Sequence, residues 1–288
     1  MAEVARGTSG RLRDVSRRLA ERFGRPGICG HEIDPVRNLV LTILSQNTTD
    51  ANRDRAYDHL VKRYPTLPAL AAARPPELEE TIRTGGLAKA KAKSILGALA
   101  RIKEEGGGYS LDFLRGMPLP RARAYLTSLP GVGVKTANIL LLFSFGLPAF
   151  PVDTHILRVT KRLGLVPATA TLAKAALSLE PHVAAGDHVP LHLNLIRLGR
   201  EVCRPRNPLC AVCPLLIVCP EGKRRTKVHT TGGSGGVAEA APHPTSSFAL
   251  LGYPRGGMAR GQYELRAAGV PPQEEERGAQ PKGKACNA

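Results

Sequence analysis

The chain has 288 residues, which is enough for two compact domains with separate cores. Its 41 Lys and Arg residues against 24 Asp and Glu give a net charge of +17, which points to a polyanionic partner. The longest apolar run, 139–152, is too short to span a bilayer and contains two prolines, so a membrane protein is excluded and nucleic acid is favoured.

The first expected helix lies in the arginine-rich N-terminal stretch, where Leu12, Val15, Leu19 and Phe23 recur at helical spacing. This stretch also contains acidic residues and lacks the apolar centre of a signal peptide. We interpret it as a folded helix, and a transit sequence is the alternative.

The next expected helix begins after Asp34, an N-cap residue that is followed by proline, and carries an apolar stripe through Leu44. The stripe stops at the polar sequence Ser-Gln-Asn-Thr-Thr, residues 45–49, and Asp50 can cap a further helix. A polar loop between two buried helices is a candidate functional loop. The alternative is that it only ends the first helix.

Further helices are expected around residues 77–83, 88–104 and 119–128, separated by breaks rich in proline and glycine. No segment alternates convincingly with the period of two that a half-buried strand requires. The sequence therefore predicts an all-α fold.

Residues 129–138 read Leu-Pro-Gly-Val-Gly-Val-Lys-Thr-Ala-Asn, which predicts a tight hairpin that leads into a helix with Lys135 in its first turn. Gly131 and Gly133 allow close backbone approach, and the unpaired N–H groups at the helix start can hold a phosphate oxygen. The positive helix end also favours the neutral amine that a lysine nucleophile needs. An ordinary solvated lysine beside a helix cap is the alternative.

A carboxylate follows Lys135 in the sequence Val-Asp-Thr-His, residues 152–155. An amine followed by Asp153 suggests Schiff-base chemistry. Asp153 also precedes a helical run over 156–163, so it can equally serve as the N-cap of that helix.

Four cysteines form the second strong pattern, Cys-x6-Cys-x2-Cys-x5-Cys, in a chain without a secretory signal. This compact and unequal spacing favours an iron–sulfur cluster over zinc, and both over structural disulfides. Arg204 and Arg206 lie between the first two cysteines and could hold a phosphate. The candidate metal ligands are Cys203, Cys210, Cys213 and Cys219.

Composition changes near His229, and residues 229–288 contain 11 Gly and 6 Pro. This segment shows no sustained hydrophobic period, so we expect a disordered tail over 225–288. It holds 6 basic and 5 acidic residues, so nearly all of the positive charge belongs to the part before it.

These motifs, in this order and spacing, resemble the endonuclease III family of helix-hairpin-helix DNA glycosylases and AP lyases. The resemblance also includes Ile-Leu-Ser-Gln-Asn-Thr-Thr-Asp at 43–50, Gly-Leu at 86–87 and Leu-Gly-Arg at 198–200, and it spans about residues 30–222. It implies that Lys135 is the nucleophile that attacks C1′ of a damaged nucleotide. Asp153 would be the essential carboxylate that stabilises the sugar or helps to activate the nucleophile.

The resemblance also implies the DNA contacts, since the family's damaged nucleotide must leave the duplex to reach the catalytic pair. Gln46 and Asn47 would fill the vacated space, and Leu87 would be an apolar wedge. Lys89, Lys91 and Lys93 are expected on a solvated face close to this wedge. Gly131 and Gly133 match the hairpin that grips the backbone, often with a bound monovalent cation, and the four cysteines would hold a [4Fe-4S] cluster.

The implied architecture is two helical domains flanking a DNA-binding cleft. A six-helix domain over 30–147 would end in the hairpin, and residues 1–29 would join 148–224 in an iron–sulfur cluster domain. We expect a monomer that acts on damaged double-stranded DNA in base excision repair, without membrane contact, in the bacterial cytoplasm at the nucleoid.

Three sites in the sequence differ from the best-known bacterial members of the family, and these differences bear on lesion preference. Val134 stands where an arginine often occurs, the Gln-Asn pair at 46–47 differs from a Ser-Ala-Gln arrangement, and Ala88 replaces an aromatic residue. Removal of oxidised pyrimidines with strand cleavage is the leading hypothesis. The alternatives are a mismatch-specific thymine or uracil glycosylase, an abasic-site-restricted lyase, and a non-catalytic DNA-binding module.

Overall fold

The computed structural model describes residues 2–27 and 34–230, with side chains for 7–27 and 34–226. Throughout these ranges the regular elements are α-helices and short 3-10 helices, so the prediction of an all-α fold is confirmed. None of the helices in the described ranges is both long and apolar enough to cross a membrane.

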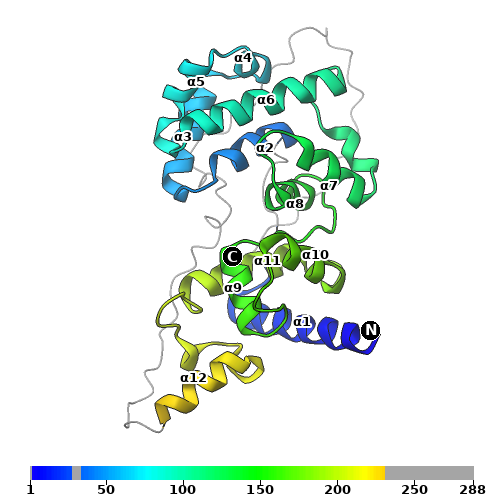
Figure 1. Ribbon diagram of the computed structural model, residues 1–288, viewed down its shortest axis with the longest axis vertical. Helices are drawn as coiled ribbons and strands as arrows, with labels where there is room; N and C mark the ends of the chain where they lie inside the picture. Colours follow the sequence, from blue (N-terminus) through cyan, green and yellow to red (C-terminus); the bar gives the residue numbers. More distant parts are fainter. Residues whose placement is uncertain (1, 28–33, 231–288) are drawn as a thin grey trace, which may run out of the picture.

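Two groups of helices divide the structure (Figure 1). The first body comprises α2 (Pro35–Leu44), α3 (Asp50–Arg63), α4 (Leu67–Ala71), α5 (Pro75–Thr81), η1 (Arg83–Gly85), α6 (Ala88–Gly106), η2 (Asp112–Gly116), α7 (Leu119–Ser128) and α8 (Val134–Phe143). The second comprises α1 (Ala2–Phe23), α9 (Thr154–Arg162), α10 (Leu172–Leu179), η3 (Glu180–His182), α11 (His188–Glu201), η4 (Cys210–Val212), η5 (Leu216–Val218) and α12 (Pro220–Thr230).

The first body packs around one hydrophobic core, to which each of its α-helices contributes, for example Leu39, Leu60, Ile95, Leu126 and Leu140. It contains seven α-helices between residues 34 and 147, where the sequence predicted six. The additional helix is α4, which has only five residues and is capped at its start by Thr66. The Thr66 hydroxyl accepts a hydrogen bond from the Ala69 amide at 3.2 Å, and a local cap of this kind stabilises a helix too short to show periodicity.

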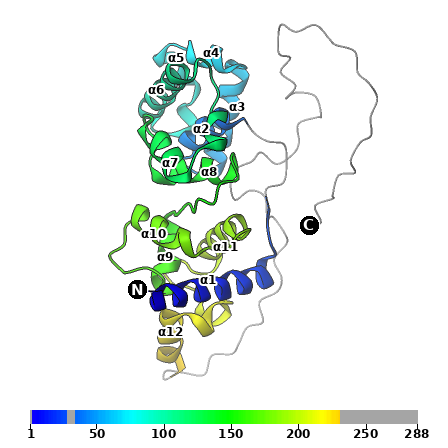
Figure 2. The same ribbon diagram turned by 90° about the vertical axis from the view of Figure 1, so that its right-hand side faces the viewer.

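The second body has its own core, in which the N-terminal helix packs against helices from the C-terminal half (Figure 2). Leu12, Val15 and Leu19 of α1 are almost fully buried, and their spacing is the one that the sequence analysis used to predict this helix. The Ser16 hydroxyl also donates to the Asp187 carboxylate at 2.8 Å, so polar contacts fix α1 as well.

Helix α12 extends to Thr230 and therefore enters the segment, from 225 onward, that was expected to be disordered. Glu221 in its first turn forms ion pairs with Arg224 at 2.6 Å and with Arg225 at 2.7 Å. Ion pairs between residues one helical turn apart stabilise a helix. The remainder of the expected tail, 231–288, lies outside the described residues.

The two bodies meet along α8, which belongs to the first core but reaches the second body (Figure 1). Leu142 and Phe143 of α8 form a small buried cluster with Leu193 of α11. Arg123 of α7 and Glu180 of η3 form an ion pair at 2.5 Å, with each side chain only 12% exposed. These contacts hold α7 and α8 of the first body against η3 and α11 of the second.

Candidate functional site: a hairpin and a catalytic pair at the junction

The hairpin between α7 and α8 is anchored by the buried side chains of Leu129 and Val132. The Val132 amide donates to the Leu129 carbonyl at 3.1 Å, and Gly131 has a φ of +77°, which disfavours any other residue. A Cβ at Gly131 would also lie 2.5 Å from Cβ of Ser94 on α6. Gly131 and Gly133 are exposed, so the turn presents backbone groups to the surface as predicted.

Lys135 is the second residue of α8, and its side chain is exposed. Asp153 is the N-cap of α9, where its Oδ1 accepts a hydrogen bond from the Ile156 amide at 2.8 Å. The capping interpretation of Asp153 is therefore confirmed. A cap does not compete with a chemical role, because the cap uses Oδ1 and a carboxylate has a second oxygen.

The charges of Lys135 and Asp153 both affect the pKa of a buried histidine of α11, His192. The pKa of His192 is lowered to about 4, mainly by burial and further by the Lys135 cation, while the Asp153 carboxylate opposes this shift. His192 is only 1% exposed, and its Nδ1 lies 2.9 Å from the Pro151 carbonyl. Its Nε2 is buried without a hydrogen-bond partner among the described residues. Lys135 and Asp153 therefore lie within electrostatic range of one imidazole.

The sequence analysis missed His192, because no motif marks it. It lies on a largely apolar helix, and only the contact between α8, α9 and α11 makes it a neighbour of the pair. Its ring also packs against Phe143 and Phe150, with ring centroids 5.7 and 6.4 Å apart. Nδ1 of His155, in contrast, lies 3.2 Å from the guanidinium of Arg158.

The 45–49 loop lies beside the hairpin. The Gln46 amide nitrogen donates to the Gly131 carbonyl at 3.0 Å and approaches the Thr136 hydroxyl at 3.4 Å. Asn47 is exposed and has a φ of +50°, an uncommon conformation for a residue other than glycine. Because Gln46 contacts both sides of the hairpin turn, the loop adjoins the helix that carries Lys135.

Leu87, the predicted apolar wedge, is exposed at the surface. Its side chain is 59% exposed and its φ is +50° with ψ +35°, so it is a large apolar residue in the left-handed region. Lys89 and Lys93 are exposed, as expected, but Lys91 is only 3% exposed and its pKa is lowered by burial. The prediction of a solvated face is therefore wrong for Lys91, which the fold of the surrounding loops covers.

The four clustered cysteines lie on one loop between α11 and α12, and each is partly buried. Burial raises the pKa of Cys213 to about 11, and negative charge on the other three thiols adds to this effect. Two of the sulfur atoms accept hydrogen bonds. The Arg162 guanidinium donates to Sγ of Cys203 at 3.2 Å, and the Gly222 amide donates to Sγ of Cys219 at 3.3 Å. Four neighbouring thiols with N–H donors around them suit a cluster that needs thiolates.

No group of three or more His, Cys, Asp or Glu side chains within the described ranges is arranged to hold a single metal ion. The donor set of the loop, four thiols without histidine, nevertheless fits an iron–sulfur cluster. Arg204 and Arg206 are exposed on the same loop.

Helix α9 connects Asp153 to this cysteine loop through two arginines that the sequence analysis did not single out. Arg158 donates to the Cys203 carbonyl at 2.9 Å, and Arg162 donates to the Arg204 carbonyl at 2.7 Å. The loop is thus fixed to the helix whose first turn Asp153 caps.

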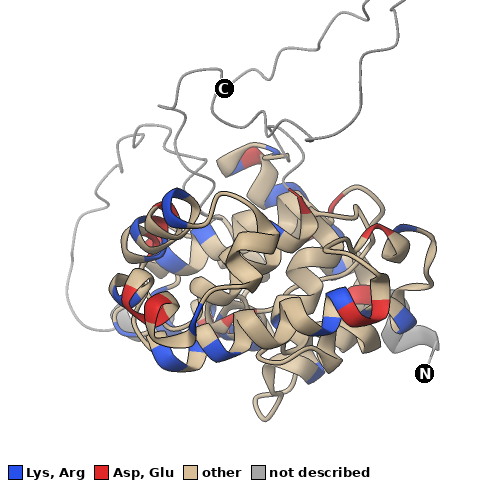
Figure 3. Ribbon diagram, turned by 90° about the horizontal axis from the view of Figure 1, so that it is seen from above, with Lys and Arg blue, Asp and Glu red and all other residues tan. Residues whose placement is uncertain are grey.

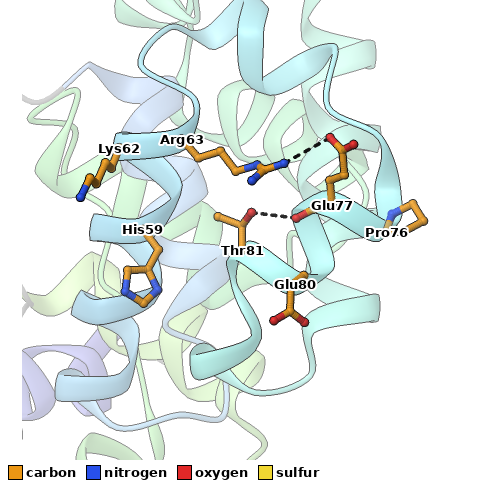
Figure 4. Close-up of a pocket in the computed structure, with 7 residues that line it drawn as sticks. All are labelled: His59, Lys62, Arg63, Pro76, Glu77, Glu80 and Thr81. Atoms are coloured by element: carbon orange, nitrogen blue, oxygen red, sulfur yellow. Dashed lines mark hydrogen bonds and ion pairs between the residues drawn. The ribbon is translucent and has the colours of Figure 1, made fainter.

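Lys and Arg residues occur on helices of both bodies (Figure 3). A surface groove of about 620 Å³ lies between α3 and α5 (Figure 4). Arg63 and Glu77 face each other across it at 3.6 Å. None of the predicted site residues lines this groove, so it is separate from Lys135 and Asp153.

Comparison with known proteins identifies the family. Residues 40–181 match the model of the HhH-GPD superfamily of base excision DNA repair proteins. Endonuclease III of Thermotoga maritima is 36% identical, over 75% of this chain and 95% of its own length. The thymine-DNA glycosylase of Aeropyrum pernix is 30% identical, over 73% of this chain and 95% of its own length.

Among solved structures, a trapped endonuclease III–DNA covalent intermediate is similar, with a TM-score of 0.65 and 32% identity. The similarity covers 76% of this chain and 98% of that one. The order of helices, the hairpin and the sequence similarity over nearly the whole length of these relatives agree with one another. The chain therefore belongs to the endonuclease III family of base excision repair DNA glycosylases, within the HhH-GPD superfamily.

Proposed function

We propose that the chain is a bifunctional DNA glycosylase and AP lyase that removes oxidised pyrimidines from double-stranded DNA and then cleaves the strand. The observation that carries this proposal is the placement of an amine, Lys135, and a carboxylate, Asp153, at the starts of two helices, from which both act electrostatically on one buried imidazole, His192. A lysine at the reacting centre supports strand cleavage in addition to base removal.

In the proposed reaction, the neutral amine of Lys135 attacks C1′ of the extruded nucleotide, and the bond to the base breaks with its electron pair leaving on the base. Opening of the sugar ring gives a Schiff base between Lys135 and C1′. Loss of a proton from C2′ then expels the 3′ phosphate, which is a β-elimination. Asp153 stabilises the positive charge that develops on the sugar and assists the proton transfers that free the amine.

The remaining site residues are assigned to DNA contact. Gln46 and Asn47 would fill the space that the extruded nucleotide leaves, and Leu87 would be the apolar wedge beside it. Gly131 and Gly133 offer backbone N–H groups to a phosphate at the start of α8. A monovalent cation at this hairpin stays a prediction. Arg204 and Arg206 would bind the phosphate backbone from the cysteine loop.

We further propose that Cys203, Cys210, Cys213 and Cys219 hold a [4Fe-4S] cluster, whose contribution is to fix the loop that carries the two arginines. Iron and acid-labile sulfide analysis of protein purified without oxygen tests this, with about four irons per chain expected. Zinc without iron would contradict it.

The two hydrophobic cores support domain limits close to 30–147 and to 1–29 with 148–224, and we propose that these act as two domains around the DNA. We propose a monomer, since one chain supplies the amine, the carboxylate and both DNA-contacting loops. With chromosomal DNA as the substrate, its place of action would be the bacterial cytoplasm, at the nucleoid.

Borohydride trapping tests the lyase directly. The wild-type chain should form a covalent complex with a duplex that contains an abasic site or an oxidised pyrimidine, because borohydride reduces a Schiff base to a stable amine. Lys135→Ala should form none, and Lys62→Ala, which removes an exposed lysine of α3, should trap like the wild type. Unchanged trapping by Lys135→Ala would reject Lys135 as the nucleophile.

A mismatch-directed thymine or uracil glycosylase is the second candidate, and the likeness to the thymine-DNA glycosylase of Aeropyrum pernix favours it. A panel of duplexes with defined lesions separates the two. Preference for thymine or uracil opposite guanine would support this candidate, and cleavage of abasic sites alone would indicate a restricted lyase. Binding without cleavage of any substrate would identify a non-catalytic DNA-binding module.

A further inference from the structure

Lys91 lies in the first turn of α6, and its buried ammonium joins the ends of two other elements. It donates to the carbonyl of Leu44 at 2.7 Å and to the carbonyl of Gly85 at 2.8 Å. Leu44 is the last residue of α2, and Gly85 is the last residue of η1. One cation therefore connects two segments that are far apart in the sequence.

Both carbonyls stand where a helix leaves its acceptors unpaired and carries partial negative charge. The two partners that the structure gives Lys91 are neutral carbonyls, although burial of an ammonium is unfavourable without compensation. Neighbouring Lys89 and Lys93 on the same helix remain exposed. The burial of Lys91 is thus specific to its position between the two helix ends.

Each of the two joined segments leads, within three residues, to an exposed residue in the left-handed region. Asn47 follows Leu44 and Leu87 follows Gly85, and both have a φ of +50°. Asparagine adopts this region more readily than other residues with a side chain, whereas for a bulky residue such as Leu87 it is unfavourable and persists only when the surroundings fix it. Nothing but Lys91 among the described hydrogen bonds links the end of α2 to the end of η1.

We propose that Lys91 is a positioning residue that sets the distance between the 45–49 loop and Leu87, so that both enter the DNA together as a damaged nucleotide leaves it. This inference rests on the proposed function above, which assigns the two segments to DNA contact. Without the shared ammonium, each segment can move by itself. Steps that require extrusion from a duplex then slow down, whereas the chemistry at a sugar that is already accessible does not.

Lys91→Met tests the inference, because it keeps the length of the side chain and removes its donors. Strand cleavage is measured in single-turnover experiments with saturating enzyme, on an abasic site in a duplex and on the same site in a single strand. We expect the duplex rate to fall about tenfold, on the order of the effect of losing charged hydrogen bonds, while the single-strand rate is unchanged. An equal fall on both substrates would overturn the proposal.

Two further variants separate positioning from general loss of structure. Leu99→Ala removes a buried side chain from the same helix, away from both loops, and should lower the melting temperature without changing the ratio of the two rates. If Lys91→Met does not fold, Lys91→Gln, which retains an N–H donor without the charge, gives the same comparison of substrates.

A double variant tests whether Lys91 acts through Leu87. Truncation of the exposed wedge in Leu87→Ala should lower duplex cleavage, and adding Lys91→Met should then cost little more, because residues that act as a unit are not additive. If the rate reductions caused by Leu87→Ala and Lys91→Met multiplied in the double variant, the proposal would be overturned. If the wild-type chain cleaved neither substrate, the proposed function itself would fail. If the wild type cleaved both substrates and Lys91→Met cleaved them at the same rates, only the positioning role of Lys91 would fail.

Discussion

At the scale of single residues, Asp153 combines a structural and a proposed chemical task in one carboxylate. Its Oδ1 caps α9 through the Ile156 amide. The sequence indicated both tasks, because an aspartate before a helical run is a common N-cap and its pairing with a lysine motif suggested catalysis. Only substitutions that keep one property and remove the other can separate the two.

Asp153→Asn should retain the cap and lose the charge, and Asp153→Ala should lose both. We expect the asparagine variant to unfold at nearly the wild-type denaturant concentration but to lose strand cleavage, since an amide oxygen still accepts the hydrogen bond. The alanine variant should lose cleavage and about 1 kcal/mol of stability. Urea denaturation and an abasic nicking assay measure these effects. An active asparagine variant would contradict the role of the charge.

His192 gives the fold a predictable response to acid. Its pKa is lowered to about 4, mainly by burial, whereas an unfolded histidine titrates near 6.5. Between these values the unfolded chain binds a proton that the folded chain does not, so stability falls as the pH drops through this window. From pH 7 to pH 5 the contribution is about 2 kcal/mol.

The measurement is urea denaturation at pH 7 and at pH 5, in the wild type and in His192→Gln. The variant removes the titrating group, so its stability should change less between the two pH values, whatever its absolute stability. His188, whose pKa is also lowered by burial, remains in both proteins and cancels in the comparison. Equal pH dependence in the two proteins would show that His192 is not held neutral.

At the scale of elements, the sequence predicted the hairpin and most helices well, because their signals are local. Proline, glycine and capping residues act on their immediate neighbours, and the apolar spacing of α1 and α2 is visible in any short window. Helices α4, α10, α11 and α12 were not among the predicted ones. For α4 and α12, the stabilising contacts are a cap at Thr66 and ion pairs of Glu221, and neither produces a periodic pattern.

Gly131 and Gly133 provide a matched pair of substitutions within the hairpin. Gly131 has a positive φ and packs against Ser94, whereas a Cβ at Gly133 would meet nothing within 4 Å. We expect Gly131→Ala to destabilise the protein by roughly 1–3 kcal/mol, through strain and overpacking, and Gly133→Ala to leave the unfolding midpoint nearly unchanged. Thermal unfolding followed by circular dichroism compares the two, and equal melting temperatures would refute the account of the turn.

At the scale of the whole molecule, the relative placement of the two bodies depends on buried polar contacts at the junction. Arg123 pairs with Glu180 at 2.5 Å and also donates to Asn138 at 2.8 Å. The same Glu180 oxygen accepts the Phe150 amide at 3.0 Å, three residues before Asp153. This network connects the helix that carries Lys135 to the chain that leads to Asp153.

Glu180→Ala should therefore reduce both stability and activity, because it leaves the buried positive charge of Arg123 without a carboxylate, with only the neutral Asn138 amide as its partner. The expected loss is about 3–5 kcal/mol by urea denaturation, together with slower cleavage at saturating DNA. Glu21→Gln, which breaks an exposed ion pair on α1, is the control and should change neither. A stable Glu180→Ala variant with normal activity would show that the junction does not depend on this pair.

The sequence by itself determined the helical class, the hairpin and the family, and it singled out Lys135, Asp153 and the four cysteines as candidate site residues. These follow from the order and spacing of residues along the chain. Only the tertiary structure decided that Lys91 is buried, that buried His192 comes within electrostatic range of Lys135 and Asp153, and that Arg158 and Arg162 connect α9 to the cysteine loop. The physical reason is that burial and neighbourhood arise from contacts between helices far apart in the sequence, which local spacing does not encode.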